Sequence, residues 1–445
     1  MEHKFNLKFI VTVTFISAIG GYLFGFDFAV ITGGLPFLTD QFGLSASGEG
    51  GTTASLAIGA VLGCIIAGSI ADKYGRKSGL MMAAFTFAIS SLIMGLAPNL
   101  PVFITGRFFA GIGVGMASLL SPLYIAEISP GQYRGRLVSL YQLTIVLGIV
   151  ITHLVNYALK DIGPEAWRWM FGSGAIPSVL FFIGVFFLPE SPRWLVKQNR
   201  KEDALGILHK VGDKNFAEQT IEDIRLSLKG AQSVSIKDIF SKLYIPLVLI
   251  GITLAVFQQW CGINVVFNYT AKIFESIGAD RSEQLVQAVY IGVANLVFTL
   301  IAISLVDKLG RKPLMLFGAG GLAILYLAIA FILETNAAAV LSPFILAAIG
   351  TYAVSLAPVT WVLISEIFPN NIRSKAISVA TVSLWLAYSI LVFTFPIIIE
   401  RLGESVPFVI YAVICVFGFL FIKTKLVETK GKTLENVEKE LLARH

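Results

Sequence analysis

Two ionisable residues stand alone inside long apolar stretches of this chain. Asp27 lies in the stretch 9–33, and Arg107 lies in the stretch 101–124. A charged side chain near the centre of a bilayer costs roughly 2.5–3.5 kcal/mol on insertion scales, so such residues are usually paired and functional. We expect Asp27 and Arg107 to face each other in one cavity, where protonation of Asp27 releases Arg107. The alternative is a static structural ion pair.

The composition places these two residues in a membrane protein. Of the 445 residues, 56% are hydrophobic and only 14% are charged, whereas soluble domains carry about 25% charged residues. The cysteines Cys64, Cys261 and Cys415 lie in apolar stretches, which does not favour a disulfide framework. The four histidines are scattered and suggest no metal site. The net charge of +6 resembles a nucleic-acid signal, but topology explains it better.

Apolar stretches long enough to cross a membrane recur along the chain. We count twelve, at 9–33, 52–71, 79–97, 101–124, 137–159, 168–188, 244–270, 285–305, 313–333, 338–364, 375–398 and 406–422. The termini and every second loop hold 28 of the 34 Lys and Arg residues. The positive-inside rule therefore places both termini in the cytoplasm, which requires an even number of spans. We expect a multi-pass protein of the cell (inner) membrane, surrounded by the lipid bilayer.

The two halves of the chain repeat each other at a nearly constant offset. The segment 72–77 (DKYGRK) recurs as 307–312 (DKLGRK), and 127–130 (EISP) recurs as 366–369 (EIFP). Each match falls at the same position of its half, so the repeats are parallel in topology. The sequence predicts an all-α membrane protein with two pseudo-symmetric six-helix halves, 1–188 and 244–445, as in major-facilitator transporters. A cytoplasmic linker with short amphipathic helices, 189–243, joins them.

The repeated charges admit a mechanical interpretation. Arginines at the cytoplasmic helix ends lie beside glutamates in both halves, and Arg–carboxylate pairs across the halves would close an inner gate. The alternative is positive-inside charge that is neutralised locally, with no role in switching. The expected network comprises Asp72, Arg76, Glu127, Arg134, Glu190, Arg193, Asp307, Arg311, Glu366, Arg373 and Glu428.

Several motifs resemble those of one family over essentially the whole chain. A lone Gly-Arg-Lys at 75–77 is a weak signal, but 189–193 (PESPR) combined with 258–264 (QQWCGIN), in order and at the expected spans, is a strong one. The chain resembles the sugar porter family of the major facilitators, especially bacterial D-xylose and D-glucose proton symporters. Val427 departs from the proline typical of the family, which affects the inner gate and not the sugar site.

The resemblance assigns roles to the isolated charges. In proton-coupled members an Asp in span 1 and an Arg in span 4 carry the coupling, and these match Asp27 and Arg107. Facilitators that do not move protons tend to have Asn at the first position. Asp27 therefore points to symport.

The resemblance also implies a sugar site. A sugar presents neutral hydroxyls and apolar C–H faces, so it calls for amide side chains and an aromatic wall. The family's sugar-binding positions match Gln142, Gln258, Gln259, Asn264, Asn295 and Trp361, with Phe24 and Trp385 as the wall. Asn268 stands where xylose-type members have Tyr, and Leu384 where they have an amide. The alternative is that the amides only join helices and the tryptophans only pack.

Two backbone features belong to this expected site. Gly262 would allow close approach of backbone or sugar, and Pro358 would break span 10 beside the site. The sequence thus predicts a proton-coupled monosaccharide symporter, for a pentose or hexose, that works by alternating access as a monomer. We expect no cofactor beyond the proton, no nucleic-acid partner and no enzymatic activity. An uncoupled sugar facilitator, a drug exporter and a membrane sugar sensor are the alternatives.

Overall fold

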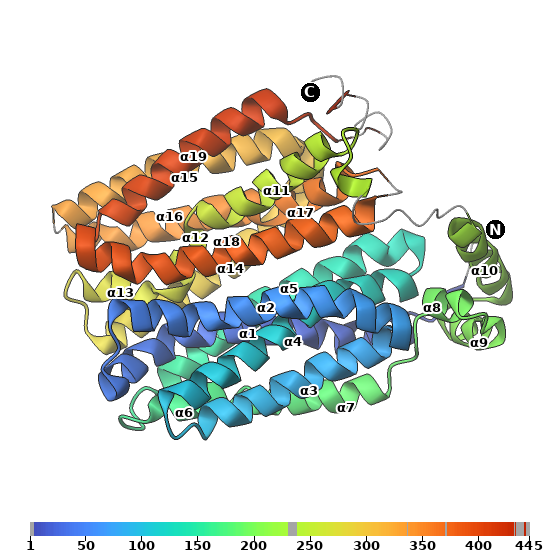
Figure 1. The fold of residues 1–445 in the computed structure, drawn as a ribbon, viewed down its shortest axis with the longest axis horizontal. Coiled ribbons are helices and arrows are strands. Elements are labelled where there is room, and N and C mark those ends of the chain that lie inside the picture. Colours follow the sequence, from blue (N-terminus) through green and yellow to red (C-terminus); the bar gives the residue numbers. More distant parts are fainter. Residues whose placement is uncertain are drawn as a thin grey trace. The chain divides into compact units, whose positions relative to one another are not determined.

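The computed structural model describes residues 4–229, 238–335, 337–369, 372–430, 432 and 440–441, without the side chains of Leu228, Lys229, Asp307, Ala338 and Ser374. Within these residues, twelve helical spans are long and apolar enough to cross a membrane, which confirms the predicted number. The helices of the first half are α1 (Leu7–Phe42), α2 (Ala46–Tyr74), α3 (Arg76–Gly95), α4 (Leu100–Ile128), α5 (Gly131–Leu159), α6 (Ala166–Gly172) and α7 (Ala175–Phe186) (Figure 1).

The second half contains more interrupted helices. They are α11 (Ile245–Trp260), α12 (Ile263–Asn268), α13 (Thr270–Glu275), α14 (Arg281–Leu309), α15 (Arg311–Glu334), α16 (Leu341–Val354), α17 (Leu356–Glu366), α18 (Arg373–Leu402) and α19 (Val406–Lys425), with the short 3-10 helices η1 (Asp238–Phe240) and η2 (Ala338–Val340). Here α11 and α12 together form one span, and α16 and α17 form another. Large apolar side chains such as Ile324 and Phe331 of α15 are more than two-thirds exposed. This apolar outer surface fits a hydrocarbon surrounding.

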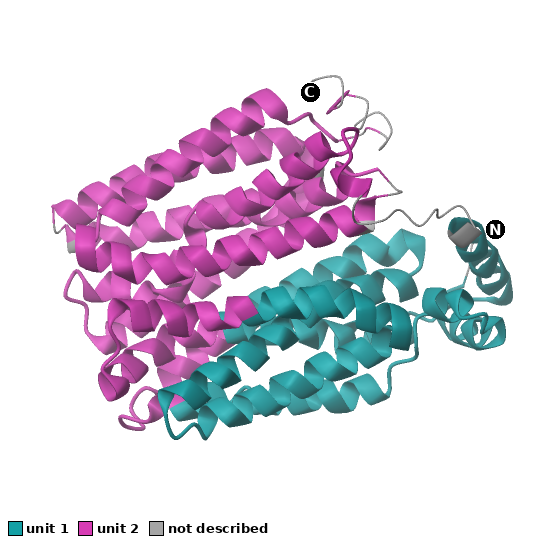
Figure 2. Cartoon of the chain, viewed as in Figure 1, with its two compact units in different colours: residues 1–28, 59–149, 168–233 teal, residues 29–58, 150–167, 234–445 magenta. Residues whose placement is uncertain are grey.

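Two compact units divide the chain differently from its sequence repeat. Unit 1 comprises residues 1–28, 59–149 and 168–233, and unit 2 comprises 29–58, 150–167 and 234–445 (Figure 2). The division runs within α1, α2 and α5. One end of each of these first-half helices therefore belongs to the same unit as the second-half helices. The predicted division at 188 and 243 follows the repeat and stays a prediction.

Backbone contact between α1 and α5 fixes the position of Asp27 in unit 1. A Cβ atom added to Gly25 would lie 2.0 Å from the carbonyl oxygen of Ile145, and one added to Gly148 would lie 2.3 Å from that of Tyr22. Small residues at such crossings let membrane helices approach closely. The segment that carries Asp27 is thus held directly against α5.

Two spans of unit 2 are broken at membrane depth. Between α11 and α12, Gly262 has a left-handed backbone (φ 87°), and a Cβ atom there would lie 2.4 Å from the ring of Tyr411. The break in span 10 is at Ser355 (φ −127°, ψ −88°), three residues before the predicted position at Pro358. Proline lacks the N–H that would continue the preceding helix, but it is tolerated in a first turn. The preceding helix α16 therefore ends at Val354, and Pro358 lies in the first turn of α17, which begins at Leu356.

Three short helices form the linker bundle next to unit 1's first span. They are α8 (Pro192–Lys197), α9 (Lys201–Val211) and α10 (Lys214–Lys229). Their apolar core includes Leu195 and Ile221. Phe5, just before α1, packs edge-on against Phe216 of α10 and Tyr133 of α5, with ring centroids 5.1 and 5.9 Å apart. The N-terminal segment therefore joins the linker bundle to the beginnings of α1 and α5.

We predict that Gly262→Ala destabilises the protein more than Gly278→Ala. Both glycines have positive φ, but nothing lies within 4 Å of a Cβ at Gly278, whereas Tyr411 blocks one at Gly262. The left-handed backbone costs about 1–2 kcal/mol at either position, and overpacking adds about 1–3 kcal/mol at Gly262 only. Thermal unfolding in detergent measures the difference. Equal losses for the two variants would contradict the close contact with Tyr411.

Candidate functional site

The structure brings Asp27 and Arg107 together in unit 1. Both side chains are buried, with residue exposures of 2% and 0%. Nη1 of Arg107 donates a hydrogen bond to the backbone carbonyl of Asp27 at 2.9 Å, and the guanidinium also acts electrostatically on the Asp27 carboxyl group. The guanidinium further lies 5.6 Å from the ring centroid of Phe171. Within the described residues, Oδ1 of Asp27 accepts no hydrogen bond.

A continuous chain of amides lies at the break in span 7. Nε2 of Gln258 donates to the hydroxyl of Tyr352 at 2.5 Å, and Nε2 of Gln259 donates to Oε1 of Gln258 at 2.5 Å. Nδ2 of Asn264 in turn donates to Oε1 of Gln259. Three predicted sugar-site amides are therefore joined to one another. We call the side chains of Gln258, Gln259, Asn264 and Tyr352 the amide network.

A second polar cluster continues along α12. Nδ2 of Asn268 donates to the carbonyl of Asn264 at 2.6 Å, and the hydroxyl of Tyr388 donates to Oδ1 of Asn268 at 3.1 Å. Tyr388 lies edge-on to Trp385, with 5.7 Å between ring centroids. Asn268 and Trp385 thus share one cluster, next to the amide network.

The other predicted sugar-site residues lie outside this cluster. Asn295 of α14 is buried, and Trp361 of α17 is 40% exposed, just after the break at Ser355. Gln142 of α5 and Phe24 of α1 are half-buried in unit 1, where Phe24 stacks edge-on against Phe28. The sugar roles of all these residues stay predictions.

Sequence reasoning missed Tyr352 and Tyr388. Each supplies the hydroxyl that completes one end of the polar clusters. Tyrosine in a membrane span needs a partner for its hydroxyl, so a tyrosine deep in spans 10 and 11 is itself a signal. The span 7 amides were recognisable because they follow one another closely, whereas these tyrosines come from two other helices.

The charges predicted for the inner gate form a clamp in the first half. Nε and Nη2 of Arg76 bind the two carboxylate oxygens of Glu127, each at 3.0 Å. The carboxylate of Glu190 accepts from the backbone N–H of Arg76 at 2.8 Å, at the beginning of α3. Ser191 donates its hydroxyl to Glu127 at 2.5 Å. A carboxylate at a helix N-terminus satisfies free N–H groups and suits the helix dipole.

The second half repeats this clamp. Nη2 of Arg311 binds Glu366 at 3.2 Å, and Glu428 accepts from the backbone N–H of Arg311 at 3.0 Å, at the beginning of α15. Thr429 donates its hydroxyl to Glu366 at 2.6 Å, as Ser191 does to Glu127. The sequence repeat is therefore also a repeat of contacts.

The Arg76–Glu127 pair lies within the first half of the chain, and the Arg311–Glu366 pair lies within the second. Ion pairs across the two halves, expected from the repeated charges, stay a prediction. Asp72 is exposed and bridges Arg76 and Lys197 at 3.3 Å. Arg134 and Arg193 are exposed, and Nε of Arg373 donates to the carbonyl of Phe368. The side chain of Asp307 lies outside the described residues.

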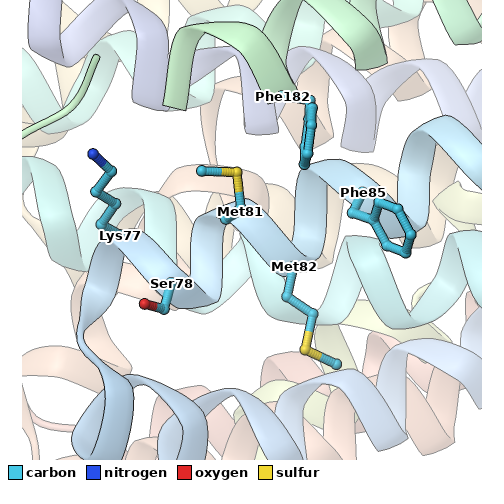
Figure 3. A pocket seen from close by; sticks show the side chains of 6 residues that line it. All are labelled: Lys77, Ser78, Met81, Met82, Phe85 and Phe182. Atoms are coloured by element: carbon cyan, nitrogen blue, oxygen red, sulfur yellow. The ribbon is translucent and has the colours of Figure 1, made fainter. Parts of the chain in front are cut away.

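A shallow pocket of about 460 Å³ lies between α3 and α7. Figure 3 shows its lining, in which Lys77 and Ser78 stand beside four apolar side chains, Met81, Met82, Phe85 and Phe182. Nζ of Lys77 donates to the carbonyl of Phe186 at 2.7 Å. This lining offers no amide, so it does not match the chemistry of a sugar site.

Twelve apolar spans in the described part of the chain, together with the repeated clamps and the broken spans, fit a membrane transporter of the major-facilitator fold. The family model "Sugar (and other) transporter" matches residues 13–441. The chain belongs to this family of sugar transporters.

Named relatives match nearly the full length of the chain. The arabinose-proton symporter of Bacillus subtilis is 38% identical over 98% of this chain and 95% of its own length. The D-xylose-proton symporter of Escherichia coli is 36% identical over 98% of this chain and 97% of its own length. Among solved structures, the inward-open conformation of the Escherichia coli xylose transporter matches with a TM-score of 0.86 and 36% identity, and covers 97% of this chain and 99% of that one.

Glu428 makes the stability of the second clamp dependent on pH. Burial alone would raise the pKa of Glu428, but hydrogen bonds from the backbone N–H groups of Lys430, Arg311 and Lys312 lower this pKa below its ordinary value of 4.5. The clamp's contribution to stability is therefore fully present above pH 4.5 and is lost as the pH falls through the lower folded-state pKa.

We expect Glu428→Gln to be less stable than the native protein at pH 7, by about 1 kcal/mol, because the amide loses the charged acceptor. This difference in stability between the native protein and the variant becomes smaller below pH 4.5, where the native carboxylate also becomes neutral. Thermal unfolding between pH 3.5 and 8 measures it, with the exposed Glu400→Gln as the control. A gap that does not change with pH would refute this role of the Glu428 charge.

Proposed function

We propose that this chain is a proton-coupled monosaccharide symporter that works by alternating access. Its substrate is a pentose or hexose of the xylose, arabinose or glucose type. The observation that carries the proposal is the buried Asp27 carboxyl group beside Arg107, of which one oxygen accepts no hydrogen bond within the described residues. The relatives designated as proton symporters support it.

The orientation follows from the loop charges. The termini, the linker and the loops on the same side of the membrane hold 28 of the 34 Lys and Arg residues, so we place that side in the cytoplasm. The protein is then a multi-pass protein of the cell membrane with both termini inside. Each half closes its own clamp, and this supports a functional monomer.

Proton binding at Asp27 follows from the cost of burying charge. A carboxylate in an apolar interior is stabilised only as far as cations and hydrogen bonds compensate it. Arg107 compensates part of this charge, and its Nη1 donates a hydrogen bond to the backbone carbonyl of Asp27. Uptake of a proton removes the remaining cost and weakens the hold on Arg107. This exchange couples the proton to rearrangement of α1 and α4.

Sugar binding follows from the chemistry of the amide network. Amides both donate and accept hydrogen bonds, so they match a ring of neutral hydroxyls without any fixed charge. Gln258, Gln259 and Asn264 satisfy one another in the structure. A bound sugar exchanges these internal hydrogen bonds for its own. The cluster of Asn268, Tyr388 and Trp385 adds an aromatic surface for the apolar C–H face.

The proposed function predicts the effect of Asp27→Asn on transport. In proteoliposomes, native protein takes up protons when sugar is added and accumulates sugar about 40-fold at 100 mV, because one charge supplies about 2.3 kcal/mol. Asp27→Asn still exchanges sugar but neither accumulates it nor moves protons. Asp40→Asn, which removes an exposed carboxylate from the same helix, behaves like the native protein. If native protein equilibrates sugar without proton movement, the chain is an uncoupled facilitator.

The amide network predicts a loss of sugar affinity in Gln259→Ala. The substitution removes a sugar partner and leaves Asn264 without its acceptor. We expect KM to rise about five- to tenfold, from about 1 kcal/mol of lost hydrogen bonding. Gln287→Ala is the matched control, because Gln287 is a hydrogen-bonded amide of α14 whose partner is Ser342. An equal rise in KM for both variants would mean a general loss of structure.

A further inference from the structure

An ion pair in unit 2 joins the first half of the chain to the second. Glu49, near the beginning of α2, binds Nζ of Lys272 on α13. The side chain of Glu49 is only 9% exposed and that of Lys272 is 28% exposed. The hydroxyl of Thr39 donates to Oε1 of Glu49 at 3.1 Å. Buried, hydrogen-bonded charges of this kind hold their partners more firmly than exposed ones.

A nearby ion pair differs in burial. Nη2 of Arg281 binds Asp40 at 2.8 Å, with the two side chains 40% and 67% exposed. The Arg281–Asp40 pair also joins the first half of the chain to the second, between the end of α1 and the beginning of α14. Solvent-exposed pairs contribute little because water screens them. The two pairs therefore form a matched comparison of buried and exposed charge.

The helix that carries Lys272 directly follows the helix that carries two of the amides. α13 follows α12 directly, with only Tyr269 between them, and α12 carries Asn264 and Asn268. The hydroxyl of Tyr269 donates to the carbonyl of Val392 on α18 at 2.7 Å. The hydroxyl of Thr32 on α1 donates to the carbonyl of Phe267 at 2.5 Å. Helices of both halves thus hold the segment that presents these amides.

We infer that Glu49 and Lys272 are positioning residues for transport. Their ion pair holds α13 in the position that closes the sugar site toward the outside of the cell. The inference rests on the proposed function and orientation, which place the connection after α13 outside the cell. The pair must part before sugar reaches the amides from outside, and it forms again as the site closes behind the sugar. Neither residue touches the sugar in this role, and each acts through the position of α12 and α13.

The pair therefore sets the balance between outer-closed and outer-open protein. Apparent affinity from outside depends on the fraction of protein in the outer-open state. Glu49→Lys replaces attraction to Lys272 by repulsion and raises that fraction. We expect KM for uptake to fall and kcat to fall with it, because closing behind the sugar becomes slower. A change that only damaged the sugar site would raise KM instead.

A thiol reaction tests the gate directly. The hydroxyl of Thr32 is buried against Phe267, so a thiol introduced there by Thr32→Cys reports whether the outer side is open. Modification by a membrane-impermeant thiol reagent added outside is measured by mass spectrometry, without sugar. We expect Glu49→Lys to raise the rate of modification about tenfold, because this rate is proportional to the fraction of protein that is open to the outside. The double variant Glu49→Lys with Lys272→Glu restores the pair and returns the rate to within about twofold of native.

Asp40→Asn is the control, and we expect it to change the rate by less than about twofold, because its pair is exposed. If Glu49→Lys does not reach the membrane in folded form, Glu49→Gln shows the same direction with a smaller effect. An unchanged rate in the Glu49 variants, or no rescue by the charge swap, would overturn the inference. The reaction needs neither sugar nor proton gradient, so its result is independent of whether the proposed symport is correct.

Discussion

Hydrocarbon offers no hydrogen-bond partners, and this constraint decides how the chain places its polar groups. Each of the three amides of the amide network donates a hydrogen bond to another amide or to Tyr352, which offsets the cost of burying these polar groups. The same side chains are the proposed sugar ligands. Sugar binding is then an exchange of partners and gains little net energy per hydrogen bond. Selectivity must come from geometry, because a poorly fitting sugar would break the internal bonds without replacing them.

The number of spans and the repeat were predictable because both depend on long-range patterns that hydropathy and charge motifs record. The ends of the helices were less predictable. α1 extends to Phe42, whereas its apolar stretch ends at 33, because the polar turns around Asp40 remain helical. Span 10 breaks at Ser355 and not at Pro358, since proline disrupts the turn before it.

The candidate site was predictable where its residues are close in sequence or match a family motif. Asp27 lies beside Arg107 as expected, and Gln258, Gln259 and Asn264, predicted as sugar ligands, are hydrogen-bonded to one another. The tyrosines that complete the polar clusters come from distant helices and were not recognised. Glu49 and Lys272 lie just outside the apolar stretches 52–71 and 244–270, so hydropathy assigned them to loops. Only the fold shows that they meet.

The two clamps have a consequence for how the chain can be divided. Each one ties the beginning of a third span to the segment that follows the sixth span of the same half, through Glu190 in one half and Glu428 in the other. Each clamp therefore lies entirely within its own half of the chain. A chain cut between Lys229 and Asp238 keeps both clamps intact, because neither clamp crosses the cut, whereas contacts such as that of Thr32 with Phe267 would then join two separate polypeptides.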